Sequence, residues 1–213
     1  PELIGMDISS LGEFDARLIE LDGTKNKKNF GANIILSLSL AFCKLSASKD
    51  KKPLYQYIYD YFLEHFSSKI EMKMPLPMMN ILNGGAHANN KLDFQEFMIQ
   101  PVGFSSFKEG LICGVEVFNY LKKTLNQKGF STAVGDEGGF APGIDSAEEA
   151  LDLISSSIEA AGYKVDKDVT FALDCAATEL LSKDNYVFSN DEKLSSDELI
   201  EYLTKLANEY PLT

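Results

Sequence analysis

The order of the periodic segments after residue 73 constrains the fold of this chain more than any other feature. Two short apolar runs come first, closed by Asn83-Gly-Gly85 and by Pro101. Two amphipathic helices, a third short apolar strand and a last helix follow. The expected strands are 76–82, 94–99 and 169–173, and the expected helices are 107–127, 146–162 and a stretch opening at Ser195. This order predicts an α/β layer or barrel with parallel strands buried on both faces, although three strands cannot close a barrel.

The first third of the chain has a helical pattern instead. Phe14, Leu18 and Leu21 recur at helix spacing, and a mostly apolar segment from Asn29 to Ala47 needs cover from other elements. Residues 67–73 change character and mark a boundary. We therefore expect a helical unit over residues 1–68 and an α/β unit over residues 74–213.

The composition excludes several classes of function. The formal net charge is -12 and Arg17 is the only arginine, so nothing resembles a surface that tracks nucleic-acid phosphates. The three cysteines lie far apart among apolar or small residues, which is typical of reduced buried thiols rather than of disulfides or a zinc site. No apolar stretch is long enough to span a bilayer, and no charged-then-apolar leader opens the chain. We expect a cytosolic protein.

Two carboxylates stand in apolar surroundings. Glu96 lies in a run that implies burial, where a carboxylate is costly unless it is paired or hydrogen-bonded. Lys91 or the amide of Gln95 would be a structural partner, and a role in a functional site is the alternative. Asp174 ends a short apolar strand, where it either caps the next turn or holds a metal ion. At the carboxyl end of a barrel strand the second role is common.

Two loops carry further candidates. Glu137 follows Asp136 in a glycine-rich turn that would allow a ligand to approach closely, although a surface acidic turn explains the same residues. The flanking apolar residues favour a packed turn. His87 lies in a loop of small residues that could close over a bound anion, and a merely exposed histidine is the alternative.

Taken together, these motifs resemble the enolase family. They are Asn83-Gly-Gly-Ala-His-Ala88, Gln95-Glu-Phe-Met-Ile99 and Gly135-Asp-Glu-Gly-Gly-Phe-Ala-Pro142. Leu21-Asp-Gly-Thr-Lys25 and Gly31-Ala-Asn33 look like the N-terminal domain of that family. The resemblance implies the first part of a TIM-like barrel with ββαα and then βα units, its first two strands antiparallel. The helical part of an α+β N-terminal domain would precede it.

The resemblance also implies an activity, the magnesium-dependent dehydration of 2-phosphoglycerate to phosphoenolpyruvate in glycolysis, reversed in gluconeogenesis. Glu137 would donate a proton to the leaving hydroxyl, and Asp174 would be one carboxylate ligand of Mg2+. His87, Gln95 and Glu96 would bind the small phosphorylated substrate, and Asp136 would support the turn. A homodimer is implied as well.

Other family residues have no counterpart in these 213 positions. The catalytic lysine base, two further metal carboxylates and C-terminal phosphate-binding residues would lie beyond Thr213, and a metal-binding loop serine before Pro1. We therefore expect a fragment that is inactive alone. Asn89-Asn90 stands where glycine is common in the family, and Leu180 where an aromatic is frequent.

Two other functions are compatible with parts of the sequence. A truncated, catalytically inactive enolase-like protein that serves as a binding or scaffold module would carry the same motifs. An unrelated metal-dependent hydrolase would need a cluster of histidine ligands, and the chain has only two histidines.

Overall fold

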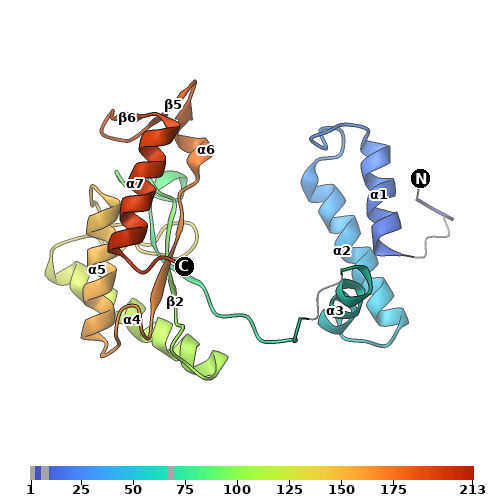
Figure 1. Ribbon diagram of the computed structural model, residues 1–213, viewed down its shortest axis with the longest axis horizontal. Helices are drawn as coiled ribbons and strands as arrows, with labels where there is room; N and C mark the ends of the chain where they lie inside the picture. Colours follow the sequence, from blue (N-terminus) through green and yellow to red (C-terminus); the bar gives the residue numbers. More distant parts are fainter. Residues whose placement is uncertain (1–2, 6–9, 67–69) are drawn as a thin grey trace. The chain divides into compact units, whose positions relative to one another are not determined.

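The computed structural model describes residues 3–5, 10–66 and 70–213, and the chain divides into two compact units, Pro1–Lys73 and Met74–Thr213 (Figure 1). Each unit has its own hydrophobic core.

The first unit is a small helical one. It contains α1 (Leu11–Asp22), α2 (Ala32–Lys49) and α3 (Leu54–His65). The side chain of Ser10 caps α1, which ends at Gly23 in a left-handed conformation with φ 67°. Phe14 and Leu18 are buried as their spacing predicts, and the ring of Phe14 stacks on Phe42 with centroids 4.5 Å apart.

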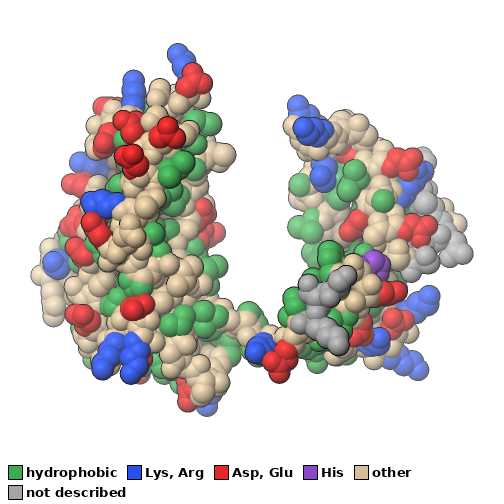
Figure 2. Space-filling model, viewed as in Figure 1, with side chains coloured by type: hydrophobic (Ala, Val, Ile, Leu, Met, Phe, Trp, Pro, Cys, Tyr) green, Lys and Arg blue, Asp and Glu red, His purple; other side chains and the backbone are tan. Residues whose placement is uncertain are grey.

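Helix α2 is less covered by other elements than its sequence predicts. Its apolar sequence predicts cover on most sides, yet in the described part of the chain only one stripe, Ile35, Cys43 and Ala47, is buried. Several of its other apolar side chains are between 36% and 67% exposed, namely Ile34, Leu36, Leu38, Leu40 and Leu45. Hydrophobic side chains are accordingly visible on the surface of this unit (Figure 2). Two neighbouring helices cannot surround a third, so the expected cover of this segment is incomplete.

The second unit is built on a three-stranded sheet in the order β1-β2-β3. The strands are β1 (Met79–Asn83), β2 (Glu96–Gln100) and β3 (Thr170–Asp174). Both neighbouring pairs are antiparallel, which confirms the family's antiparallel first pair and corrects the expectation of parallel neighbours. For β1 and β2 the physical reason is that a single loop joins them and returns the chain in the opposite direction. Two successive helices separate β2 from β3, so that connection also ends with the chain reversed relative to β2. Strands β1 and β3 consequently run the same way.

Parallel pairing does begin at the outer edge of β3. Phe171 donates its backbone N–H to the carbonyl of Pro211 at 2.9 Å, and Thr213 donates to the carbonyl of Phe171 at 3.0 Å. The resulting bridge between Phe171 and Leu212 is parallel. The sheet is thus open in the described part of the chain, as expected for the first part of a barrel.

Helices cover this sheet on one side. They are α4 (Phe107–Gln127) and α5 (Ala147–Ala160), which lie along one another (Figure 1). Val117, Leu121 and Leu125 on α4 are completely buried, as are Phe97 and Phe171 on the strands. Burial of side chains this large supplies most of the stability of such a unit. The core therefore fixes the strands that carry the polar residues on the opposite face of the sheet.

The remaining elements of the second unit follow or interrupt the sheet. They are the 3-10 turn η1 (Gly85–His87), α6 (Ala177–Leu180), the small sheet β4 (Leu181–Ser182), β5 (Asn185–Val187) and β6 (Lys193–Leu194), and α7 (Ser196–Glu209). Leu180, where the family often has an aromatic, packs at the edge of the core.

Helix α7 begins with the capping box that its sequence predicts. Ser195 accepts from the N–H of Glu198 at 3.3 Å, and Glu198 accepts from the N–H of Ser195 at 2.8 Å. We expect Ser195→Ala to lower the free energy of unfolding by about 1 kcal/mol, because the backbone N–H of Glu198 loses its acceptor. Urea denaturation would measure this, with Ser196→Ala, one residue inside the helix, as the control. An equal loss in both variants would contradict the capping role.

The three cysteines are free thiols, and Cys43 and Cys113 are buried. Burial raises the pKa of Cys113 to about 12, so this thiol stays protonated and unreactive near neutral pH. Among the described residues, no helix combines the length and the apolar character needed to cross a membrane.

Candidate active site

The pairing of the strands places three polar residues in one row across the sheet. Glu96 at the start of β2 is opposite Asn83 at the end of β1 and opposite Asp174 at the end of β3. Directly opposed residues in an antiparallel pair project to the same face. The row therefore lies at the carboxyl ends of β1 and β3, on the face that the apolar core leaves free.

A bulge in β1 adds a fourth polar residue to this face. Asn80 pairs with Met98 and Leu82 pairs with Phe97, so one extra residue, Ile81, stands between the two pairs. Strict alternation would put Asn80 and Asn83 on opposite faces, since they are three positions apart. The bulge shifts the alternation by one residue, and both asparagines face the same side as Glu96.

The turn that carries Glu137 is attached to the end of β1 by backbone hydrogen bonds. Asn83 donates its N–H to the carbonyl of Phe140 at 2.8 Å, and Phe140 donates to the carbonyl of Ile81 at 3.0 Å. A Cβ added at Gly139 would lie 2.2 Å from Oδ1 of Asn83, and one at Gly135 would lie 2.6 Å from the carbonyl of His87. The glycines thus permit an approach that no other residue allows, and the turn is packed on its inner side as predicted.

These connections bring His87, Glu96 and Glu137 together. Nδ1 of His87 is 3.7 Å from Oε1 of Glu96 and 3.6 Å from Oε2 of Glu137. Asn80 donates from Nδ2 to Oε2 of Glu137 at 3.3 Å. One ligand atom from each of the first three residues lies within 4.8 Å of the other two, so this group could hold a metal ion.

The two glutamates differ in their electrostatic surroundings. Burial and then the neighbouring carboxyl of Glu137 raise the pKa of Glu96 above its ordinary value. The hydrogen bond with Glu96 lowers the pKa of Glu137, and Asn80 and His87 lower this pKa further. The slight desolvation of Glu137 acts in the opposite direction. The Glu96 side chain is 16% exposed and that of Glu137 is 47% exposed, so a negative charge costs more on Glu96 than on Glu137.

Asp174 lies beside this group, and its carboxylate accepts hydrogen bonds from two neighbouring residues, Ala176 and Gln95. Its Oδ1 accepts from the N–H of Ala176 at 2.9 Å, which is the capping role considered from the sequence. Its Oδ2 accepts from Nε2 of Gln95 at 3.2 Å. Asp136 is exposed, and its backbone N–H lies 3.4 Å from the carbonyl of His87, a contact that joins the turn to the histidine loop.

Neither structural partner suggested for Glu96 is used. Lys91 lies 3.6 Å from Asp145, and the amide of Gln95 is engaged by Asp174. Glu96 has a second acid, Glu137, and a histidine, His87, as its neighbours instead.

The site also contains two residues that the sequence motifs did not indicate, Asn80 and Asn83. The side chain of Asn83 is fully buried, yet in the described structure its Oδ1 and Nδ2 have no hydrogen-bond partner, and the same is true of Oδ1 of Asn80. Both are amides inside an apolar strand, which is the signal that singled out Glu96.

The unusual Asn90 contributes to the loop that positions His87. Its Nδ2 donates to the carbonyl of Asn83 at 2.9 Å and to that of Pro142 at 3.0 Å. These bonds connect the histidine loop to the end of the glutamate turn. An asparagine at this position therefore fits the loop.

Comparison with known families agrees with the geometry. The profile described as the C-terminal TIM barrel domain of enolase matches residues 71–213, and that of the enolase N-terminal domain matches residues 1–58. The chain belongs to the enolase family. The enolase barrel match contains the whole candidate site, and the enolase N-terminal match covers α1, α2 and the start of α3.

Proposed function

We propose that this chain supplies one side of the active site of a magnesium-dependent hydro-lyase that converts 2-phosphoglycerate to phosphoenolpyruvate. The observation that carries the proposal is the convergence of His87, Glu96 and Glu137 within 4.8 Å at the carboxyl ends of the barrel strands. Removal of a proton next to a carboxylate needs a cation that absorbs the growing negative charge, and loss of hydroxide needs an acid. This site offers carboxyl groups that could serve as ligands of the cation and as the acid.

The donor set suits a divalent cation. Glu96, Glu137 and Asp174 offer hard carboxylate oxygens, the ligands that Mg2+ prefers, and each carboxylate oxygen of Asp174 keeps a lone pair beyond its present hydrogen bond. Nδ1 of His87 is buried and has no hydrogen-bond partner in the described structure, which leaves it free for a ligand. We assign Asp174 to the cation and His87 to the substrate. The bound cation would stabilise the negative charge that develops on the substrate carboxylate.

In this proposal Glu137 is the acid that protonates the leaving hydroxyl. Its exposed position on a glycine turn lets it reach a substrate, while Asn80 orients its carboxyl group. The hydrogen bond between Glu96 and Glu137 offers a route by which the proton favoured on Glu96 reaches Glu137. Gln95 would act by holding Asp174 in place as well as by contact with the substrate.

A lysine base would have to come from outside the described site. In the described part of the chain, the lysines that form ion pairs do so with acids outside the cluster of His87, Glu96 and Glu137. We therefore propose that the 213 residues alone do not turn over substrate. The cytosolic homodimer that the family resemblance implies also remains a proposal.

The direct test is an assay of phosphoenolpyruvate formation with the native protein from its source and with the 213-residue chain. We expect magnesium-dependent turnover by a native protein clearly larger than this chain, and none by the chain alone. A native protein of this length without turnover would favour the inactive binding or scaffold module.

Replacement of Asp174 tests the assignment of the metal ligand. We expect Asp174→Ala to weaken Mg2+ binding by roughly tenfold or more, because a hard cation depends on charged oxygen ligands. Isothermal titration calorimetry of the native protein measures this. Asp184→Ala, which removes an exposed aspartate in the β4–β5 turn, is the control. Equal affinity in the two variants would remove Asp174 from the metal site.

A further inference from the structure

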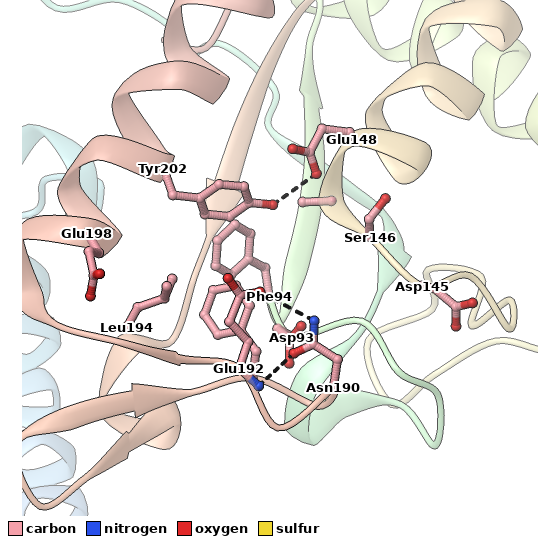
Figure 3. A pocket seen from close by; sticks show the side chains of 12 residues that line it. Asp93, Phe94, Asp145, Ser146, Glu148, Asn190, Glu192, Leu194, Glu198 and Tyr202 are labelled. Carbon is pink, nitrogen blue, oxygen red and sulfur yellow. Dashed lines mark hydrogen bonds between the residues drawn. The ribbon is translucent and has the colours of Figure 1, made fainter.

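A second concave site lies in the second unit and uses a different set of side chains. It is a cavity of about 280 Å3. Four segments converge on it, namely the loop before β2, the start of α5, the β5–β6 hairpin and α7 (Figure 3). Its volume lies just below the range of about 300 to 1,000 Å3 that is usual for ligand pockets, so a small ligand is indicated.

Aromatic rings form one part of the cavity wall. Phe94 and Phe188 meet edge to face, with centroids 6.2 Å apart and an interplanar angle of 79°. Tyr202 stands 5.9 Å from Phe188 at 67° and 6.0 Å from Phe94 at 43°. Phe188 and Tyr202 are only partly buried, so their ring surfaces are available to a ligand. Rings set at steep angles around a cavity are the usual means of binding an organic cation.

The cavity also carries a surplus of negative charge. Of its five carboxylates, two are near a lysine, since Lys205 lies 3.2 Å from Glu148 and Lys91 lies 3.6 Å from Asp145. The other three receive hydrogen bonds from neutral groups in the described structure. Asp93 accepts from the N–H of Ser189, Glu192 from the amide of Asn190, and Glu198 from the N–H of Ser195. Acidic side chains are also visible on the surface around α7 and the hairpin (Figure 2).

Asp93 and Glu192 are the acids best placed to meet a cation. Glu198 is already used by the start of its helix, whereas Asp93 and Glu192 lie together beneath the aromatic rings (Figure 3). Burial raises the pKa of Asp93, and the charge of Glu192 adds to this effect, as expected for two acids that share no cation.

The arrangement does not suit a metal ion. In the part of the chain that the structure describes, the cluster of His87, Glu96 and Glu137 is the group in which three such ligand atoms come within 4.8 Å of one another. The carboxylates of the cavity are too far apart to meet that condition. A divalent cation needs several oxygen ligands at once, and aromatic faces offer it none.

We propose that this cavity binds a small alkylammonium ion. Its ammonium group would lie among Asp93, Glu192 and the rings of Phe188 and Tyr202, and its aliphatic part would extend along the cavity wall. The inference is independent of the proposed dehydration, since none of these side chains belongs to the cluster of His87, Glu96 and Glu137.

Pentylamine is a suitable probe, because it combines one ammonium group with a short apolar chain. We expect pentylamine to bind saturably to the 213-residue chain at low millimolar concentrations in low salt. Two-dimensional amide NMR would monitor this titration. The shifts should concentrate at Phe94, in the β5–β6 hairpin and on the first turns of α7. Pentanol, which has the same shape without the charge, should bind at least several-fold more weakly.

Two variants separate the contributions of ring and charge. Phe188→Leu keeps an apolar side chain but removes a ring, and we expect binding about tenfold weaker. Glu192→Gln removes one charge at an exposed position without changing shape, and we expect binding about threefold weaker. Glu159→Gln, which removes an exposed charge on α5 outside the cavity, should leave the affinity unchanged.

The proposal would be overturned if pentylamine caused no saturable shifts, or if pentanol bound equally well. It would also be overturned if Glu192→Gln and Glu159→Gln had the same affinity for pentylamine. A fourth contrary result would be displacement of pentylamine by MgCl2 more effectively than by NaCl of equal ionic strength. If Phe188→Leu fails to fold, the Glu192→Gln comparison still decides. A lysine-containing peptide that binds at the same residues more tightly than pentylamine would support the alkylammonium site and identify its source as a protein side chain.

Discussion

Glu137→Gln should abolish dehydration in the catalytically complete enzyme while leaving exchange of the α-proton of 2-phosphoglycerate with solvent. Glutamine preserves the shape of the side chain and its position beside Asn80, but it has no acidic proton to give to the leaving hydroxyl. General acid catalysis contributes a factor of about 100 to 10,000, so we expect a loss of turnover in that range.

The measurement has two readouts. Phosphoenolpyruvate formation reports the complete reaction, and incorporation of deuterium from heavy water into recovered substrate reports proton removal alone. Glu159→Gln, an exposed change on α5, is the control for general effects of a lost charge. A parallel loss of both readouts in Glu137→Gln would show that Glu137 does not act as the acid after proton removal.

The second large effect concerns the turn that carries this residue. Gly139→Ala should destabilise the second unit by about 3 kcal/mol and displace Glu137 from the site. A Cβ at this position would lie 2.2 Å from Oδ1 of Asn83, 2.9 Å from the backbone nitrogen of Leu82 and 3.0 Å from the carbonyl carbon of Ile81. Overpacking of this kind typically costs 1 to 3 kcal/mol, and two of the three contacts are backbone atoms that cannot rotate away.

Gly143→Ala is the matched control, because a Cβ there has no neighbour within 4 Å. Urea denaturation of the 213-residue chain compares the two variants directly. Asn83→Ala combined with Gly139→Ala should recover only part of the loss, since removing the amide leaves the backbone contacts with Ile81 and Leu82. Equal stability of Gly139→Ala and Gly143→Ala would contradict the close approach of the turn to β1.

Much of the local structure is predictable from the sequence because its signals are local. Helix α4 spans 107–127 as its amphipathic pattern predicts, and Ser195 with Glu198 begins α7 by a complete capping box. At α5 the box is only half formed, since Ser146 accepts from the N–H of Glu149 while the Glu149 side chain reaches Asp145 instead.

The first strand was predicted less accurately. It begins at Met79 rather than at Leu76, because Pro75 and Pro77 lack the N–H groups that a strand pair requires. The expected parallel sheet was wrong for the neighbouring pairs, since alternation of elements does not reveal whether a connecting loop reverses the chain.

Part of the candidate site can likewise be predicted from the sequence. The sequence specifies the chemical identity of four candidate residues, His87, Glu96, Glu137 and Asp174. It also shows that Glu96 is a carboxylate within an apolar run, which indicates a special environment. The roles of these four residues as acid, substrate contacts and metal ligand remain proposals that the experiments above test.

Which of these groups meet was settled by folding, because the contacts join positions far apart in the chain. The register of β2 and β3 puts Glu96 opposite Asp174, and two backbone hydrogen bonds to β1 bring Glu137 to His87. The bulge at Ile81 turns Asn80 and Asn83 to one face, an effect of a single unpaired residue that alternation of residue types cannot encode. Burial then raises the pKa of Glu96, whereas the pKa of Glu137 is lowered, since the cost of a charge depends on the surrounding structure and not on the residue alone.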